Sequence, residues 1–70
     1  MTEIRAEIAA NVWQVKVEVG QDVEAGETVA ILESMKMEIP VEAPVGGRVS
    51  EVKVAPEDKV QEGDVIAVIE

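Results

Sequence analysis

The feature that most limits the possible folds of this chain is an internal repeat. Residues 12–33 align with residues 49–70 without a gap, and 8 of the 22 aligned positions are identical, including Gly26 and Gly63. Neither copy is long enough to bury a core of its own, so both must contribute strands to one shared core. We therefore expect a single domain over residues 1–70, whose halves are related by a pseudo-two-fold axis.

Both copies contain the same succession of strand and turn signals. Residues 15–19 alternate between apolar and polar side chains, as do residues 52–54 in the second copy, which predicts a strand in each. Val12 and Val49 lie three positions before these segments and break the two-residue period, which predicts a bulge or a strong twist. A short apolar strand then closes each copy, at residues 29–32 and 65–69.

Turns are expected between these strands. Gly20, Gly26 and Gly63 stand at polar positions where glycine can adopt a left-handed backbone, and residues 56–58 form the fourth turn signal. The segment 38–47 joins the copies. It alternates as a strand and contains Pro40, which implies a sheet edge or an outward-facing N–H position. It ends in a turn at Gly46 and Gly47, and Gly46→Val should disturb that turn if Gly46 needs a φ above zero. No segment free of glycine and proline has a helical period, so the sequence predicts a small all-β barrel or sandwich.

Composition excludes most kinds of catalysis. The chain has no histidine and no cysteine, so it lacks imidazole bases, thiolate nucleophiles, disulfides and ordinary zinc sites, and its acids do not follow a calcium-loop spacing. We predict no catalytic residue, no metal site and no enzymatic activity. A core of Val, Ile, Leu and Ala is expected, because the single aromatic residue is Trp13, to which the sequence assigns no function.

Charge and hydropathy bear on partners and location. The net charge of −9 disfavours nucleic acid and anionic membranes. Its main expected effect is solubility, and the alternative is steering toward basic partner surfaces. No signal peptide is visible and no apolar run is long enough to span a membrane. We expect a cytoplasmic protein that is monomeric in isolation.

One short run breaks the local rules for β-structure. The segment Glu33-Ser34-Met35-Lys36-Met37-Glu38 connects two expected strands, yet it contains none of the usual turn residues Gly, Pro, Asn or Asp. Such failures are expected at functional sites. Two methionines beside a lysine at a hairpin tip cannot both be buried, so at least one should be exposed. The lysine is thus a candidate for carrying a covalently attached group.

At this run the chain resembles the biotinyl domains of biotin-dependent carboxylases, within the biotin/lipoyl attachment family. The family motif is a lysine between two methionines preceded by Glu-Ala, and Ser34 replaces that alanine here. Residues 20–26 and 43–49 also fit the family pattern. Glu57 departs from it, because the family commonly has glycine there; a less strained turn or some lost stability would follow. The short loop between Val15 and Val23 leaves no room for the "thumb" of some carboxyl carriers, so the chain is similar to the small standalone biotinylated proteins of mycobacteria.

The resemblance implies a fold and a function. The fold is a flattened barrel-sandwich hybrid of two four-stranded sheets related by a pseudo-two-fold axis, with the attachment lysine on a hairpin tip. Biotin is the implied covalent cofactor, joined to Lys36 by a biotin–protein ligase. The domain would then carry CO₂ between biotin carboxylase and the carboxyltransferase of an acyl-CoA or related carboxylase. Met35 and Met37 would mark the lysine for biotin, and Glu33, Ser34 and Glu38 would complete the recognition motif.

Two alternatives stay open. The first is a lipoyl carrier with Lys36 lipoylated, although lipoyl domains commonly carry an acidic residue and alanine around their lysine. The second is an unmodified binding module whose methionine-rich tip docks in a partner's groove.

Overall fold

The computed structural model describes residues 1–70 as eight β-strands. The structure contains no helix that is long and apolar enough to cross a membrane. The strands are β1 (Thr2–Arg5), β2 (Ala10–Val15), β3 (Asp22–Val23), β4 (Thr28–Ser34), β5 (Met37–Glu42), β6 (Gly47–Val52), β7 (Lys59–Val60) and β8 (Val65–Ile69).

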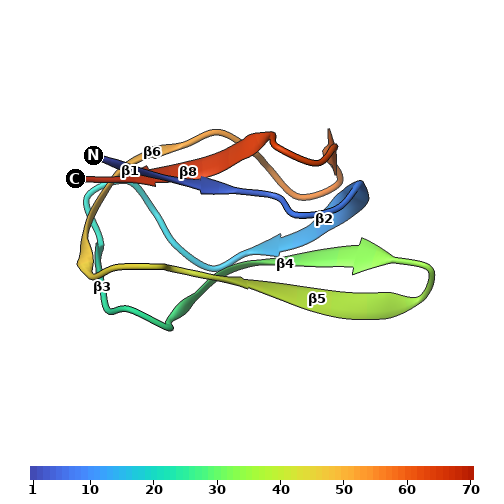
Figure 1. Cartoon of the computed structure of the whole chain (residues 1–70), viewed down its shortest axis with the longest axis horizontal. Coiled ribbons are helices and arrows are strands. Elements are labelled where there is room, and N and C mark those ends of the chain that lie inside the picture. Colours follow the sequence, from blue (N-terminus) through green and yellow to red (C-terminus); the bar gives the residue numbers. More distant parts are fainter.

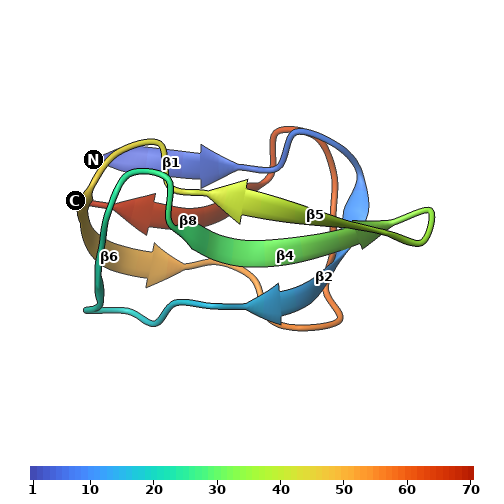
Figure 2. The ribbon, with the colours of Figure 1, turned by 90° about the horizontal axis from the view of Figure 1, so that it is seen from below.

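The strands form two antiparallel four-stranded sheets, which confirms the expected fold class. One sheet has the order β1-β8-β6-β3 and contains both chain ends; we call it the terminal sheet. The other has the order β5-β4-β2-β7 and contains the β4–β5 hairpin; we call it the hairpin sheet. Figure 1 shows the sheets as two layers, with the N- and C-termini together at one end of the molecule. Figure 2 shows the β4–β5 hairpin projecting beyond the other strands at the opposite end.

The predicted bulge is confirmed in both halves. In β2 the register shifts between Val12 and Gln14, and in β6 it shifts between Val49 and Glu51. Each bulge places an extra residue in its strand, Trp13 in the first half and the corresponding serine in the second. Because a bulge turns both of its residues to one side while the flanking valines face the core, the three-residue spacing of the valines is explained.

The predicted boundaries of these bulged strands are wrong. The sequence places strands at residues 15–19 and 52–54, whereas β2 ends at Val15 and β6 ends at Val52. Alternation does continue beyond β2, since Val17 is buried. The ladder ends nevertheless, because after the bond from the Lys16 N–H to the Val29 carbonyl the chain bends into a turn that begins at Glu18.

Four four-residue turns have the same hydrogen bonding. In each turn the last residue's N–H donates to the first residue's carbonyl, and the last residue's side chain accepts from the first residue's N–H. The third residue of each turn has positive φ: Gly20 (+92°), Gly26 (+89°), Glu57 (+78°) and Gly63 (+91°). The turns at Gly26 and Gly63 occupy corresponding positions of the repeat, as do those at Gly20 and Glu57. This arrangement is the left-handed third position of a type II turn, which favours glycine.

Glu57 keeps this left-handed backbone although it is not glycine. The sequence left open whether the turn relaxes or loses stability, and its φ of +78° shows that the turn has not relaxed. Pro56 presets the preceding φ, which favours the same turn. The left-handed conformation of an L-residue costs about 1–2 kcal/mol.

Gly46 and Gly47 differ from the sequence expectation. Gly46 does not have positive φ, so the condition under which a side chain there would disturb the turn is not met. A Cβ at Gly47 would instead lie 2.5 Å from the carbonyl oxygen of Glu70 and 2.6 Å from a methyl group of Ile69. At Gly46 the nearest atom would be the Val23 carbonyl oxygen at 3.4 Å. Glycine is therefore required at position 47, because two backbone segments approach each other closely there.

The core lies between the two sheets and contains only Val, Ile, Leu and Ala, as expected. Its largest fully buried side chains are Leu32, Ile66, Ile69, Val12, Val29 and Val49. No buried side chain is polar or charged. Both halves supply this core, so the hairpin that carries the lysine is anchored through Leu32 to the body of the molecule.

Candidate functional site

The β4–β5 hairpin ends in a connection of only two residues. Ser34 pairs with Met37 as the last rung of the ladder, which leaves Met35 and Lys36 as the loop. Their φ angles are +52° and +65°. Two consecutive residues with positive φ in a two-residue hairpin loop define a type I′ turn, which normally contains Asn-Gly. Lys36 therefore lies at the tip itself, as the sequence predicted.

The ladder below the tip maintains this strained turn. Four further pairs continue in register from Glu33 with Glu38 to Ala30 with Val41, and Leu32 is almost wholly buried beneath them. Each non-glycine residue in the left-handed region costs about 1–2 kcal/mol, so the turn stores about 2–4 kcal/mol. Because the ladder and the buried Leu32 fix the register, the strain cannot be relieved without losing these contacts.

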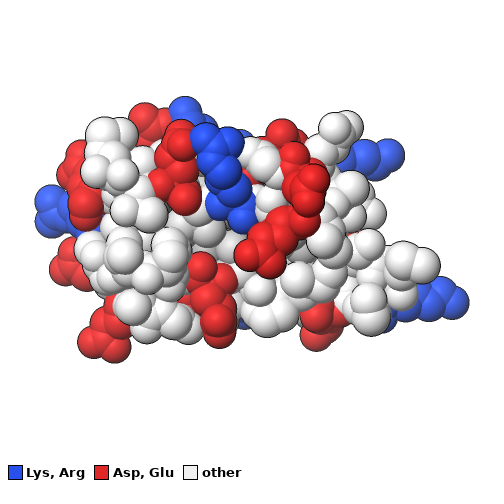
Figure 3. Space-filling view, viewed as in Figure 1, with Lys and Arg blue, Asp and Glu red and all other residues white.

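The tip exposes the side chains that the motif contains. Met35 is 89% exposed and Met37 is 58% exposed, so the expectation of at least one exposed methionine holds for both. Lys36 is also exposed and takes part in none of the three ion pairs of the molecule. Figure 3 shows a basic side chain at the far end of the projecting hairpin, surrounded by uncharged atoms. The amine is therefore accessible to another molecule from several sides.

The two glutamates of the motif lie directly opposite each other on β4 and β5. Glu33 pairs with Glu38 in the register, and both are exposed. Opposite residues of antiparallel strands point to the same face, which here is the face away from Leu32 and the core. Ser34 and Met37 form the next pair and point to the core side of the hairpin, where Ser34 is half-buried. Like charges directly opposite each other destabilise a sheet, so this pair does not contribute to folding.

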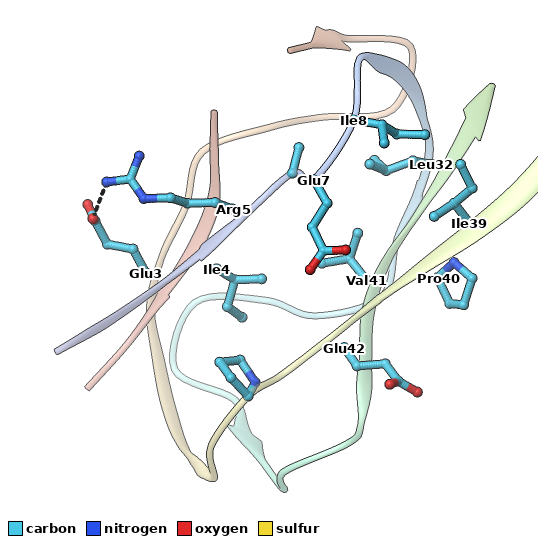
Figure 4. A pocket seen from close by; sticks show the side chains of 12 residues that line it. Glu3, Ile4, Arg5, Glu7, Ile8, Leu32, Ile39, Pro40, Val41 and Glu42 are labelled. Atoms are coloured by element: carbon cyan, nitrogen blue, oxygen red, sulfur yellow. Dashed lines mark hydrogen bonds and ion pairs between the residues drawn. The ribbon is translucent and has the colours of Figure 1, made fainter. Parts of the chain in front are cut away.

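A hollow of about 500 Å³ lies between the edge strands of the two sheets. Figure 4 shows its lining side chains, which come from β1 and the residues that follow it, from Leu32 of β4, and from β5 and a proline beyond it, with the Glu3–Arg5 ion pair at one side. Ile4 and Leu32 contribute buried apolar surface to it. The hollow begins several residues from Lys36 along the hairpin, and it contains no histidine, cysteine or serine.

The structure brings together no group that could act on the lysine. No three acidic side chains are close enough to hold a metal ion. Every buried side-chain nitrogen and oxygen atom has a hydrogen-bond partner, so none is left available for an internal ligand. The arrangement of the tip presents an exposed amine.

Comparison with known proteins agrees with this geometry. Residues 2–69 match the family model described as "Biotin-requiring enzyme", and the chain belongs to this biotin/lipoyl attachment family. The predicted resemblance is thereby confirmed, and biotin is the cofactor that the matched family requires.

Two small proteins are similar over most of their length. The chain is 52% identical to the Biotinylated protein TB7.3 homolog of Mycobacterium leprae, covering 96% of this chain and 94% of that protein. It is 51% identical to the Biotin/lipoyl attachment protein of Bacillus subtilis, covering 90% of this chain and 86% of that protein. The match to small proteins of this size confirms the resemblance to the short kind.

A related domain also occurs within a large carboxylase. The crystal structure of the Kluyveromyces lactis urea carboxylase matches with a TM-score of 0.92 and 36% identity, covering 99% of this chain and 6% of that one. This chain therefore has the fold of a carrier-type domain, which is non-catalytic by itself.

Proposed function

We propose that this protein is a biotin carboxyl carrier and that Lys36 is its attachment residue. The observation that carries the proposal is the position of Lys36, exposed and without an ion-pair partner, on a two-residue left-handed turn that projects from a rigid sheet. The family match and the Lys36 motif support biotin as the group attached.

The residues of the tip fit such an attachment. An amide would join Nζ of Lys36 to the carboxyl carbon of biotin, with the loss of one water overall. An amine is mostly protonated at neutral pH, and this chain has no histidine or cysteine that could remove the proton. A separate biotin–protein ligase must therefore do so, and the projecting turn allows its active site to enclose the amine.

Biotin, when bound, supplies the ring nitrogen that accepts and gives up a carboxyl group. The chain itself holds the tip away from its surface and keeps it in one conformation through the β4–β5 ladder. Its proposed partners are a biotin carboxylase and a carboxyltransferase that acts on an acyl-CoA or related acceptor. The presence of a related domain within the urea carboxylase supports partners of this class.

The experiment is an intact-mass measurement after co-expression with both a biotin–protein ligase and a lipoate ligase. A gain of one biotin less one water in the wild type, absent from Lys36→Arg, is the expected result. A gain of one lipoate less one water would make the protein a lipoyl carrier, a candidate that the similarity to a biotin/lipoyl attachment protein keeps open. An unchanged mass in both would indicate an unmodified binding module and reject the proposal.

A further inference from the structure

The outer face of the hairpin sheet carries an apolar stripe beside the attachment hairpin. Ile31 of β4 pairs with Pro40 of β5, and the bulge of β2 places Trp13 and Gln14 across from Ile31 on the other side. Leu32 and Val12 face the core, so these neighbours face outward. We call Trp13, Ile31 and Pro40 the outer stripe; it crosses β2, β4 and β5.

The outer stripe is open to solvent. Trp13 is 44% exposed, Pro40 is exposed and Ile31 is half-buried. A tryptophan left this exposed is unusual in a chain that has no other aromatic residue. Burying it against another molecule would remove a large apolar ring from water.

On the outer face of the terminal sheet, the pseudo-symmetric position is covered from solvent. There the equivalents of Trp13, Ile31 and Pro40 are Ser50, Val68 and Glu3, with Val68 only 4% exposed. Ser50 donates a hydrogen bond from its Oγ to the Val68 carbonyl oxygen at 3.2 Å.

Ion pairs flank Val68 on both sides. Arg5 pairs with Glu3 on β1, and Lys53 pairs with Glu51 at β6. Their aliphatic stems cover apolar surface while their charges face water. The scaffold can therefore seal this face with polar side chains, and it does so only on the sheet that lacks the attachment lysine.

The charges beside the outer stripe indicate the kind of surface that would cover it. The row between the stripe and the tip reads Lys59, Asn11, Glu33 and Glu38 across the sheet. Glu42 lies on the other side of the stripe on β5. The rim is mainly acidic on the hairpin strands, so a complementary surface has an apolar centre and basic side chains around it.

We propose that the outer stripe is a docking surface for the biotin–protein ligase, which contacts it with an apolar patch bordered by basic side chains. This inference rests on the proposed function, because an enzyme that encloses Lys36 must lie against the strands next to the tip. Three residue pairs separate the Ile31–Pro40 pair of the stripe from that tip, so one surface can cover both. Tryptophan at the centre of such a contact is the residue type that most often carries binding energy.

The test measures biotinylation of the intact protein by a purified biotin–protein ligase at limiting carrier concentration. Trp13→Ser, which introduces the residue found at position 50, should raise KM about tenfold and leave kcat unchanged. Val45→Ser is the matched control: Val45 is 41% exposed but lies beyond the far end of β5. It should leave both constants at wild-type values. Pro40→Glu copies Glu3 of the terminal sheet and gives a second variant, should Trp13→Ser fail to fold; its KM should rise as well.

Several results would overturn the proposal. One is an unchanged kcat/KM in both stripe variants when their melting curves match the wild type. A loss of equal size in Val45→Ser would also reject it, because the effect would not be specific to the stripe. If size-exclusion chromatography shows a wild-type dimer that Trp13→Ser dissociates, with ligation unaffected, the stripe is covered by a second copy instead. A wild type that never gains biotin would reject the proposed function, and the intact mass distinguishes that case.

Discussion

The two ends of the molecule are built alike but finish differently. At the terminal end Thr2 pairs with Ile69, and at the hairpin end the corresponding residues Ile39 and Leu32 pair in the same way. Beyond these pairs one end has the N- and C-termini (Figure 1), whereas the other has a two-residue turn that contains Lys36. The comparison teaches that the duplicated halves form a pseudo-symmetric pair of sheets. The candidate attachment site lies only at the end where the segment between the two copies forms the hairpin.

The outer faces of the two sheets differ in the same sense. Val68 lies beneath polar and charged neighbours on the terminal sheet, while Ile31 lies beside an exposed tryptophan on the hairpin sheet. The outer face of the terminal sheet thus has the features of a surface that serves stability alone. The hairpin sheet retains strain at its tip and apolar surface on its outer face, neither of which contributes to stability.

The largest expected effect concerns the closest backbone contact at the terminal end. Gly47→Ala would place a Cβ 2.5 Å from the Glu70 carbonyl oxygen and should lower the free energy of unfolding by about 3 kcal/mol. Gly46→Ala, with its nearest atom at 3.4 Å, should change it by less than about 1 kcal/mol. Urea denaturation measures both. Equal losses in the two variants would contradict the view that Gly47 is fixed by close packing.

The next effect concerns strain at the hairpin end. Replacing the tip by Asn-Gly, as Met35→Asn with Lys36→Gly, should raise the free energy of unfolding by about 2 kcal/mol, because these residues suit a type I′ turn. The melting temperature should rise by about 8–16 °C in a domain of this size. This variant should also take up no biotin. A melting temperature equal to that of the wild type would show that the native turn is not strained.

A smaller gain in the free energy of unfolding is expected from a change at Glu57, which lies in the second half of the repeat. Glu57→Gly relieves a single left-handed residue at φ +78° and should stabilise the protein by about 1 kcal/mol. The reciprocal change at the equivalent turn, Gly20→Glu, should destabilise it by a similar amount. Thermal melts of the two variants give shifts of opposite sign if the turns are equivalent. Shifts of the same sign would break the correspondence between the halves.

The smallest effect is expected for the attachment residue itself. Lys36→Ala removes an exposed side chain with no ion-pair partner, so the free energy of unfolding should change by about 0.5 kcal/mol or less. Differential scanning calorimetry would detect a larger change. A melting temperature many degrees lower would mean that Lys36 has a structural role at the tip.

Much of this architecture could be predicted from the sequence, because the repeat and the valine spacing are local signals. The bulges at Val12 and Val49 follow from the valine spacing, the edge position of Pro40 from its missing N–H, and the tip position of Lys36 from the strands on either side of it. The two-residue strands β3 and β7 have no period to detect. The end of β2 does not follow from the pattern, because apolar alternation continues past Val15 to the buried Val17, just before the turn that begins at Glu18.

Other features depend on contacts between distant parts of the chain. The constraint on Gly47 arises from Glu70, which no local pattern indicates. The outer stripe requires the register of three strands, so no local pattern connects Trp13 with Ile31 and Pro40. Roles for the residues of the attachment motif stay predictions until biotinylation is measured.

The most direct test of the central claim compares two complementary lysine variants. One retains Lys36 alone, with Lys16, Lys53 and Lys59 changed to arginine, and the other is Lys36→Arg with those three intact. Both are treated with a biotin–protein ligase, ATP and biotin, and their intact masses are measured. The account predicts a gain of one biotin less one water in the first variant and no gain in the second. A gain in the second, or none in the first when it folds like the wild type, would contradict the claim that the hairpin tip is the attachment site.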